Sequence, residues 1–528
     1  MGLDLLDRVD FLRLDANQKL QKSRNTDWGQ FLTPAPVARM LAALIVNRRR
    51  EVRILDAGAG SGSLFAAAVG ELCQRTHKPN SIYVSAYEID PALAAYLPDT
   101  FAFCDAACRA AGVAFLSQSF EGDFLAAVSP HLTDGLVASD DFPLFDLAIL
   151  NPPYKKINAE SHARHMLAGM GIETTNLYTG FMAVVVRLLA PGGELVAITP
   201  RSFCNGSYFR SFRKSFLTEM RLRTLHVFES RHRAFREDDV LQENVILHAT
   251  KGGSRGKVCI VSSSGPEDEL PLARQVKYAE VVRPDDPQAF IHIAADDLGN
   301  RVAASLAGFQ ASLQDLGLTV STGRVVDFRA KDYLRQNPEK GTVPLIWPTH
   351  FDRGYIAWPK IGSKKPEAIL NDVSVRSQLL PNENYVLVRR FSSKEEKRRV
   401  VAAVYEASRI PSDAVGFENH LNYFHHGGRG FDLPLAKGLA IFLNSTLVDV
   451  YLRQFNGHTQ VNATDLRSLR YPSVEQLRRL GDNVSNMFPA QSEVDTLLSK
   501  ELNMPDDQGI DSVKVKKKVV RGSSGRVR

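Results

Sequence analysis

Residues 52–69 constrain the fold of this chain more than any other segment. Residues 52–56, Val-Arg-Ile-Leu-Asp, predict a short strand, and the glycine-rich turn 57–62 follows at once. The apolar run 64–69 predicts a helix after the turn. Because glycines let the backbone approach a ligand closely, this arrangement is typical of the nucleotide-cofactor site in a doubly wound sheet. The sequence therefore predicts an α/β domain.

A carboxylate follows the next predicted strand. Residues 82–87 form an apolar run that ends in Glu88, Ile89 and Asp90. In a doubly wound sheet, this position places Glu88 where the two hydroxyls of a ribose bind. A solvated strand end is the other explanation for Glu88.

A third strand is predicted at residues 113–119, and Asp123 and Phe124 after it offer a carboxylate and a ring to an adenine. The glycine turn contains neither G-x-G-x-x-G nor G-x-x-x-x-G-K-[ST], and the lack of the second pattern disfavours a P-loop nucleotidase. The spacing of these motifs alone leaves a dinucleotide and S-adenosylmethionine open as cofactors.

The tetrapeptide Asn151-Pro152-Pro153-Tyr154 follows another apolar run, residues 145–150. Its two prolines end the strand and stiffen the turn. The side-chain oxygen of Asn151 and the carbonyl of Pro152 can accept the two N–H groups of a planar amine, while Tyr154 stacks on the ring. Such binding favours a pyramidal nitrogen whose lone pair can attack, without a charged general base. A simple strand-ending turn would also explain the tetrapeptide, and its neighbours decide between the two.

A helix start near the N-terminus is a further candidate. Thr33 precedes Pro34 and Pro36, and this pattern predicts a capped helix that continues through Leu44. The hydroxyl and free N–H groups of such a start can face a ligand. Taken alone, the pattern is better explained as a helix cap without a role in binding.

Composition limits the remaining possibilities. A chain of 528 residues predicts about two to four domains. The net charge of +6 permits nucleic acid as a partner without requiring it. Five widely spaced cysteines without a C-x-x-C pair disfavour a disulfide framework and a structural metal. No apolar run of about 18 residues and no basic–apolar leader is present, which predicts a cytoplasmic protein without a membrane segment.

Taken in order, five segments resemble the successive motifs of the γ-class N6-adenine DNA methyltransferases of type II restriction–modification systems, the Eco57I/TaqI-like methylases. These segments are residues 29–34, 56–62, 88–90, 123–124 and 151–154. The resemblance implies a Rossmann-like methyltransferase sheet followed by a mixed α+β target-recognition domain. The family often has glutamate in place of Asp56 and phenylalanine in place of Tyr154, and the residues found here are common alternatives.

The same resemblance implies roles for individual residues. Those expected to contact S-adenosylmethionine are Thr33, Asp56, Gly58, Gly60, Glu88, Ile89, Asp123, Phe124 and Asn151. Those expected to hold the adenine for catalysis are Asn151, Pro152, Pro153 and Tyr154.

A basic loop with one aromatic residue lies between the last two predicted strands of this domain, residues 222–228 and 244–249. Extracting a base from a duplex needs a second ring surface opposite Tyr154, and cations that hold the distorted backbone. In the family, a phenylalanine just before the final strand has this role, and Phe235 is the matching candidate. Phe228 is the rival, but it ends an apolar strand and fits the core better.

The second half of the chain has the composition of a DNA-binding domain. Residues 261–290 are polar and predict a junction between a catalytic domain at 1–260 and a recognition domain at 291–495, with a basic, disordered tail at 496–528. Each basic or amide-rich run is by itself explained as solvated surface, but beside a base-handling site they favour DNA contacts. The candidates are Arg231, Arg233, Arg324, Arg389, Arg390, Lys394, Asn456, His458, Gln460 and Asn462.

The sequence thus predicts a monomeric, S-adenosylmethionine-dependent enzyme that methylates N6 of an adenine flipped from a specific site in double-stranded DNA. It would protect host DNA from a separate restriction endonuclease. One alternative is a methyltransferase acting on RNA or on a protein glutamine, which the long C-terminal half disfavours. Another is a non-catalytic DNA-specificity subunit, which the intact tetrapeptide disfavours. A fused nuclease is a third, but residues 395–397 lack an upstream Pro-Asp pair at a usable spacing and lie in a basic run.

Overall fold

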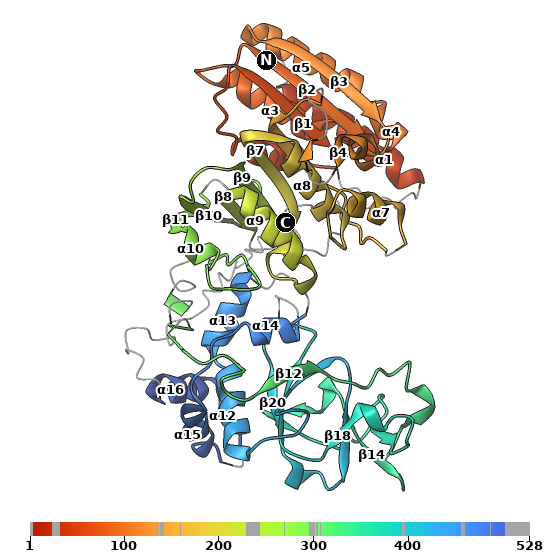
Figure 1. The fold of residues 1–528 in the computed structure, drawn as a ribbon, viewed down its shortest axis with the longest axis vertical. Coiled ribbons are helices and arrows are strands. Elements are labelled where there is room, and N and C mark those ends of the chain that lie inside the picture. Colours follow the sequence, from red (N-terminus) through yellow and green to blue (C-terminus); the bar gives the residue numbers. More distant parts are fainter. Residues whose placement is uncertain are drawn as a thin grey trace, which may run out of the picture. The chain divides into compact units, whose positions relative to one another are not determined.

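The computed structural model divides the chain into two compact units (Figure 1). The first unit is Met1–Asp296 with Gln454–His458, and the second is Asp297–Arg453 with Thr459–Arg528. The structure describes residues 4–23, 32–133, 136–137, 142–158, 160–228, 243–268, 270–294, 301–302, 305–306, 308–392, 396–455, 460–485 and 487–501.

The division falls later than the junction expected at residues 261–290. That segment instead adds β11 (Leu272–Lys277) and α10 (Tyr278–Val281) to the first unit, next to β10 (Lys257–Ser263). Its polar composition has a physical reason, because β11 is the edge strand of a sheet and most of its side chains are exposed. An exposed edge strand and a linker have the same composition.

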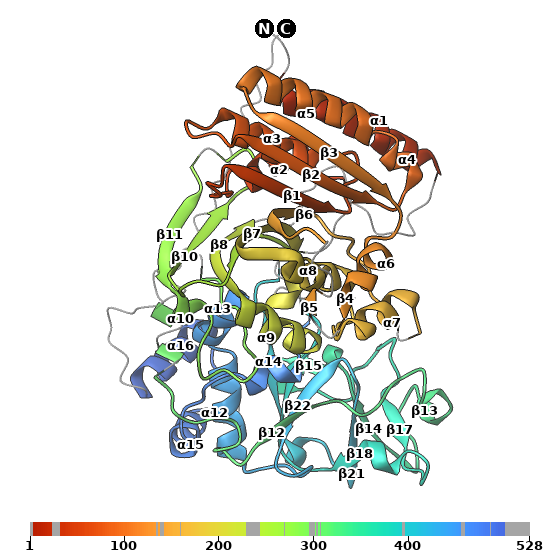
Figure 2. The same ribbon diagram turned by 45° about the horizontal axis from the view of Figure 1, so that its top comes forward.

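A mixed sheet forms the centre of the first unit. Among the described residues its strand order is β11-β10-β8-β9-β7-β6-β1-β2-β3, and Figure 2 shows β3, β2, β1 and β6 side by side. The remaining strands are β1 (Glu51–Ala57), β2 (Ser81–Glu88), β3 (Ala114–Glu121), β6 (Phe145–Leu150), β7 (Leu189–Pro200), β8 (Met220–Phe228) and β9 (Asn244–Lys251). Strands β4 (Leu132–Thr133) and β5 (Leu136–Val137) form a separate short pair.

The direction of the strands places their ends together. Strands β1, β2, β3, β6 and β7 are parallel, whereas β9 runs antiparallel between β7 and β8. From β1 the chain builds outward to β2 and β3, and β6 then lies on the other side of β1. This reversal is a topological switch point, where doubly wound sheets bind ligands beyond the carboxyl ends of the strands. The predicted doubly wound sheet and its strands β8 and β9 are confirmed. These two strands are not the final pair, because β10 and β11 follow them in the same sheet.

Helices cover both faces of this sheet. Successive strand side chains point to opposite faces, so Ile54 packs with α2 and α3 while Leu55 packs with α8. All six side chains of β6 are buried, which explains why the strand is apolar except for Asp146. The helices are α1 (Leu5–Ser23), α2 (Ala35–Ala42), α3 (Ser63–Gln74), α4 (Pro91–Ala94), α5 (Leu97–Ala111), α6 (Phe124–Val128), α7 (His162–Gly169), α8 (Leu177–Leu188) and α9 (Arg210–Glu219).

The second unit is mixed α+β, as expected. Its described strands form two sheets, in the orders β12-β22-β19-β20-β16-β15 and β13-β17-β14-β21-β18. These strands are β12 (Thr319–Thr322), β13 (Leu334–Arg335), β14 (Thr342–Ile346), β15 (Phe351–Asp352), β16 (Tyr355–Ile356), β17 (Ala368–Leu370), β18 (Leu379–Pro381), β19 (Tyr385–Arg389), β20 (Ala402–Tyr405), β21 (Ala414–Phe417) and β22 (Leu421–His425). In the core of this unit, the buried ring of Tyr385 packs edge to face with those of Phe417 and Tyr423.

Two glycines bring helices of the second unit into backbone contact. A Cβ atom on Gly438 in α12 would lie 1.7 Å from the Leu477 carbonyl oxygen, and one on Gly481 in α15 would lie 1.8 Å from that of Pro434. The helices are α12 (Leu433–Leu443), α13 (Thr446–Phe455), α14 (Ala463–Arg467), α15 (Val474–Asp482) and α16 (Gln491–Glu501). No single described helix is long and apolar enough to cross a membrane, and only the bent pair α12 with Thr446–Gln454 meets that test by length and composition.

A buried histidine makes the stability of the first unit depend on pH. His226 in β8 has Nε2 2.7 Å from the hydroxyl of Ser263, and burial lowers its pKa to about 4, against a smaller opposing effect of Asp268. Its contribution to stability is therefore complete above the ordinary histidine pKa of about 6.5 and is lost as the pH falls toward 4. We expect a change from pH 7 to pH 5 to cost about 2 kcal/mol through this residue.

Thermal unfolding of the parent and His226→Asn at both pH values measures this effect. The Tm of His226→Asn should fall less between pH 7 and pH 5 than that of the parent. The control His165→Asn, at an exposed position in α7, should behave like the parent. Equal losses in the parent and His226→Asn would contradict the prediction.

Candidate active site

A cavity of about 360 Å³ lies in the first unit at the carboxyl edge of the parallel strands. Its volume is within the range of small-molecule sites. Residues that follow four different strands line it, namely Gly58 and Gly60 after β1, Glu88 and Ile89 at β2, Asp123 and Phe124 after β3, and Asn151 and Pro153 after β6. Four motifs that are far apart in the sequence therefore meet at one cavity.

The glycine turn after β1 forms one wall of the cavity. Gly58 and Gly60 have φ angles of +86° and +58°, a conformation that other residues rarely adopt. The amides of Gly58 and Ala59 donate to the carbonyl of Tyr87 at 2.9 and 2.8 Å, which fixes the turn against the end of β2. A side chain on Gly60 would also meet Leu32 at 2.9 Å.

Glu88 joins the two turns that border the cavity. One carboxylate oxygen accepts from the amide of Gly60 at 2.7 Å, and the other accepts from the amide of Asp90 at 2.8 Å. The side chain is only 3% exposed, and burial raises its pKa although these two hydrogen bonds oppose the effect. A buried acceptor thus lies where the sequence predicted contact with a ribose.

Asp56 has a different position from the one expected of a cofactor ligand. It is fully buried and does not line the cavity. One carboxyl oxygen accepts from the amide of Phe65 at 3.3 Å, and the other has no hydrogen-bond partner. Burial raises its pKa to about 8, with a smaller contribution from the charge of Glu88. The contact with Phe65 braces the glycine turn against the first turn of α3.

Thr33 does not cap a helix as the sequence predicted. The N-cap of α2 is Pro34, and the first helical amide, that of Ala35, donates to the carboxylate of Asp10 at 3.1 Å. Thr33 lies one residue before the N-cap, so its side chain is not used to cap the helix. Its hydroxyl instead accepts a hydrogen bond from Nδ2 of Asn151 at 3.0 Å. Thr33 does not line the cavity but holds a residue that does.

The ring of Tyr154 is fixed from two sides. Its hydroxyl donates to the carbonyl of Ile198 in β7 at 3.2 Å, and its ring lies edge to face with Tyr178 at 6.3 Å. The hydroxyl of Tyr178 is in turn 2.8 Å from that of Ser202. Burial raises the pKa of Tyr154 above its usual range, so the phenol remains neutral and can serve as a ring surface rather than as a base.

Asp123 and Phe124 lie at the start of α6. The Asp123 carboxylate caps this helix by accepting from the amide of Leu125 at 2.8 Å. Phe124 packs against Tyr87 and Phe181, with ring centroids 5.2 and 5.3 Å apart. This packing fixes an aromatic ring at the wall of the cavity.

Residues directly after the tetrapeptide also line the cavity, and the sequence did not reveal them. The amide of Ile157 donates to the carbonyl of Thr175 at 2.8 Å, and the amide of Leu177 donates to the carbonyl of Lys155 at 2.9 Å. These bonds hold the segment against the start of α8, so it forms a wall. The missed lining residues include Lys155, Lys156, Ile157, Asn158, Ser161 and His162. Their segment has no periodic apolar pattern, and the adjacent lysines were the available signal.

Several predicted residues lie outside the described residues. They are Arg231, Arg233, Phe235, Lys394, Asn456, His458 and, in the tail, residues 502–528. Phe228, the rival of Phe235, is 6% exposed and belongs to the core cluster with α2 and α3, as its apolar strand indicated. The role of Phe235 stays a prediction.

The described DNA-contact candidates of the second unit make contacts within that unit. Arg324 donates to the hydroxyl of Tyr423 at 3.1 Å, Arg389 lies 5.2 Å from the ring of Phe351, and Arg390 donates to the carbonyl of Asn419. Gln460 pairs with Phe391 in an isolated bridge, and Asn462 is the N-cap of α14. Their contacts with DNA stay predictions. Among the described residues, no group of three or more His, Cys, Asp or Glu side chains is arranged for a metal ion.

Comparison with known proteins identifies the family of the chain. The model of the Eco57I restriction-modification methylase matches residues 120–235. Type II methyltransferase M.PstI of Providencia stuartii is 43% identical over 497 residues, which are 94% of this chain and 97% of the relative. Type II methyltransferase M.BsuBI of Bacillus subtilis is 42% identical over 508 residues, which are 94% of this chain and 98% of the relative.

A solved structure agrees with this result at the level of the fold. The Type IIL restriction-modification enzyme MmeI in complex with DNA superimposes with a TM-score of 0.54 and 12% identity, over 94% of this chain and 74% of that one. Because two relatives match this chain along almost its whole length, the chain belongs to the type II methyltransferases of restriction–modification systems.

Proposed function

We propose that this chain transfers the methyl group of S-adenosylmethionine to N6 of an adenine extracted from duplex DNA. Membership of the family makes it a site-specific DNA methyltransferase with S-adenosylmethionine as its cofactor. The choice of adenine N6 rests on one observation. Asn151 of the tetrapeptide lines the cavity at the switch point and is oriented there by Thr33.

The residues around the cavity fit the cofactor. Glu88 offers a buried carboxylate at the end of β2, and Phe124 and Ile89 offer apolar surface for an adenosine. The turn with Gly58 and Gly60 keeps side chains away from that space. When bound, S-adenosylmethionine supplies an electrophilic methyl group.

The tetrapeptide binds and orients the amine of the target. Because Nδ2 of Asn151 donates to Thr33, its side-chain oxygen is the acceptor that this amide offers to the amine. Pro152 and Pro153 have no N–H group, so this part of the turn presents carbonyl acceptors without competing donors. Two acceptors on one amino group favour the pyramidal nitrogen that attack requires.

Tyr154 supplies a neutral stacking surface for the base. Its hydroxyl is anchored on β7, so stacking does not require the ring to be ordered first. By the resemblance to the family, we assign to Phe235 the stacking on the face of the base opposite Tyr154. The excess proton passes to water after attack, since the tetrapeptide contains no residue with a basic side chain.

We further propose that the enzyme acts as a monomer and is paired with a separate restriction endonuclease of the same specificity. Support for this pairing comes from the two type II relatives, which this chain matches over nearly its whole length. The same match disfavours RNA or a protein glutamine as the substrate.

Replacement of Asn151 tests the reaction. The parent protein should transfer labelled methyl groups to unmethylated plasmid DNA, and Asn151→Ala should be slower by at least about 100-fold because an acceptor for the amine is lost. Asn80→Ala, before β2 at the opposite edge of the sheet, is a matched control and should remain active. Equal labelling by Asn151→Ala, or label on cytosine in the product DNA, would refute the assignment.

A second variant distinguishes two roles for Thr33. Thr33→Val keeps the shape but removes the acceptor for Asn151, so we expect kcat to fall about 10-fold, with little change in KM for S-adenosylmethionine. Thr33→Ser should restore most of the rate. If Thr33→Val instead raised only KM for S-adenosylmethionine, Thr33 would be a cofactor ligand, as the family resemblance implies.

A further inference from the structure

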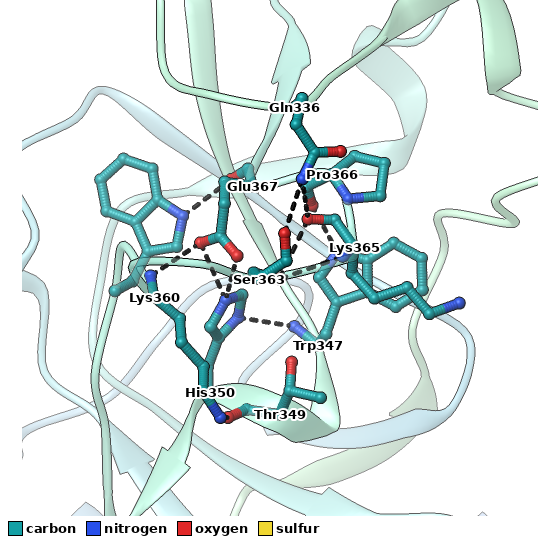
Figure 3. Close-up of polar contacts among 10 residues, drawn as sticks. Gln336, Trp347, Thr349, His350, Lys360, Ser363, Lys365, Pro366 and Glu367 are labelled. Carbon is teal, nitrogen blue, oxygen red and sulfur yellow. Dashed lines mark hydrogen bonds and ion pairs between the residues drawn. The ribbon is translucent and has the colours of Figure 1, made fainter.

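A buried hydrogen-bonded pair, His350 and Glu367, lies in the second unit (Figure 3). Nε2 of His350 lies 3.0 and 3.2 Å from the two carboxylate oxygens of Glu367, and its Nδ1 accepts from the backbone amide of Trp347 at 3.0 Å. His350 therefore carries its proton on Nε2 and donates it to the carboxylate. His350 is 1% exposed and Glu367 is 3% exposed.

Burying a carboxylate is costly unless every oxygen is well paired. Hydrogen bonds from residues that precede Glu367 in the chain offset the cost of burying it. Its side chain accepts from the backbone amide of Lys360 at 2.9 Å, and its backbone carbonyl accepts from Nε1 of Trp358 at 2.7 Å. The pair thus holds both ends of a loop, residues 358–366, which we call the lysine loop.

Further hydrogen bonds fix the interior of the lysine loop. Nε2 of Gln336 donates to the carbonyls of Ser363 and Lys365 at 2.8 and 3.2 Å. Nε1 of Trp347 donates to the carbonyl of Pro366 at 2.7 Å. Figure 3 shows these side chains converging on the loop backbone. The loop is therefore held in one shape by groups that lie outside it.

This fixed loop presents cations and one apolar side chain to solvent. Ile361 at its tip is fully exposed, and Lys360, Lys364 and Lys365 are also exposed. Nζ of Lys360 donates to the carbonyl of Thr349 at 3.0 Å. The ammonium of Lys365 lies 4.6 Å from the ring of Trp347 and 4.0 Å from the carboxylate of Asp327. The acid that follows the loop, Glu367, faces inward.

We propose that the lysine loop contacts the backbone of the target DNA, with Ile361 directed into a groove. Lysines bind phosphates without regard to sequence, and an apolar side chain can contact a thymine methyl group or a sugar. A solvated run of lysines needs no rigid support, whereas a loop ordered before binding loses less entropy on contact with DNA. This inference rests on the proposed function, because it takes the substrate to be duplex DNA.

The triple variant Lys360→Gln/Lys364→Gln/Lys365→Gln tests the charge of the loop. Binding of duplex DNA with the recognition site is measured from low to high salt. We expect the Kd for DNA to rise at least about 10-fold near physiological salt, and the slope of log K against log salt to fall by about two to three. The affinity for S-adenosylmethionine and kcat at saturating DNA should stay as in the parent.

A matched control has the same change of charge elsewhere. Lys78→Gln/Lys257→Gln/Lys277→Gln removes three exposed lysines at the amino edge of the first unit's sheet, opposite the cavity. This control should keep the parental Kd and salt slope. If the lysine-loop variant did the same while methylating DNA normally, the loop proposal would be overturned and the proposed function would stand. Failure of the parent to methylate DNA would overturn the proposed function instead.

A second pair of variants tests the support of the loop. Glu367→Ala releases both the His350 and the Lys360 contacts, so we expect a higher Kd for DNA with the salt slope unchanged, because the lysines remain. Glu367→Gln keeps an acceptor and should restore binding. If Glu367→Ala kept the parental Kd for DNA, the supporting role of Glu367 would be overturned.

Discussion

The parallel pairing of β1 with β6 is the constraint on which the site depends. Ile54 lies opposite Leu147 and Leu55 opposite Ala148, so both strands end at the same edge of the sheet. The glycine turn that follows β1 and the tetrapeptide that follows β6 are therefore neighbours in space, although about 90 residues separate them in the sequence. A shift of this register by one residue would turn the buried side chains of β6 to the opposite face and move Asn151 away from the cavity.

Buried carboxyl groups fix the shape of loops in both units. Glu88 accepts from the amides of Gly60 and Asp90, and Asp56 accepts from that of Phe65. Glu367 has the same relation to Lys360 in the second unit. For Glu88 and Glu367, backbone N–H donors of a turn compensate the cost of burial. Asp56 has a single donor, in the first turn of α3, and burial raises its pKa. The glycine turn and the loop at residues 358–366 are thus each held in part by a buried carboxylate.

The central sheet and the cofactor motifs were predictable because their signals are local. Residues 145–150 are apolar except for Asp146 since both faces of β6 are covered, and the glycine turn needs positive φ angles. Contacts between distant residues left no such signal. Thr33 has the spacing of a helix cap, but its bond to Asn151 spans 118 residues, and the pairing of His350 with Glu367 follows no period. The polar edge strand β11 was mistaken for a junction because an exposed edge strand and a linker have the same composition.

The conformation of the loop at residues 358–366 does not depend on its outward side chains. The hydrogen bonds that hold it end on backbone atoms of residues 360, 363, 365 and 366. The outward side chains at 361 and 364 take no part in them, so these positions are free to change while the loop keeps its course. A restriction–modification enzyme that acquires a new target must alter what it reads without losing its fold. Substitutions at positions 361 and 364 should therefore change the surface of the loop at little cost in stability.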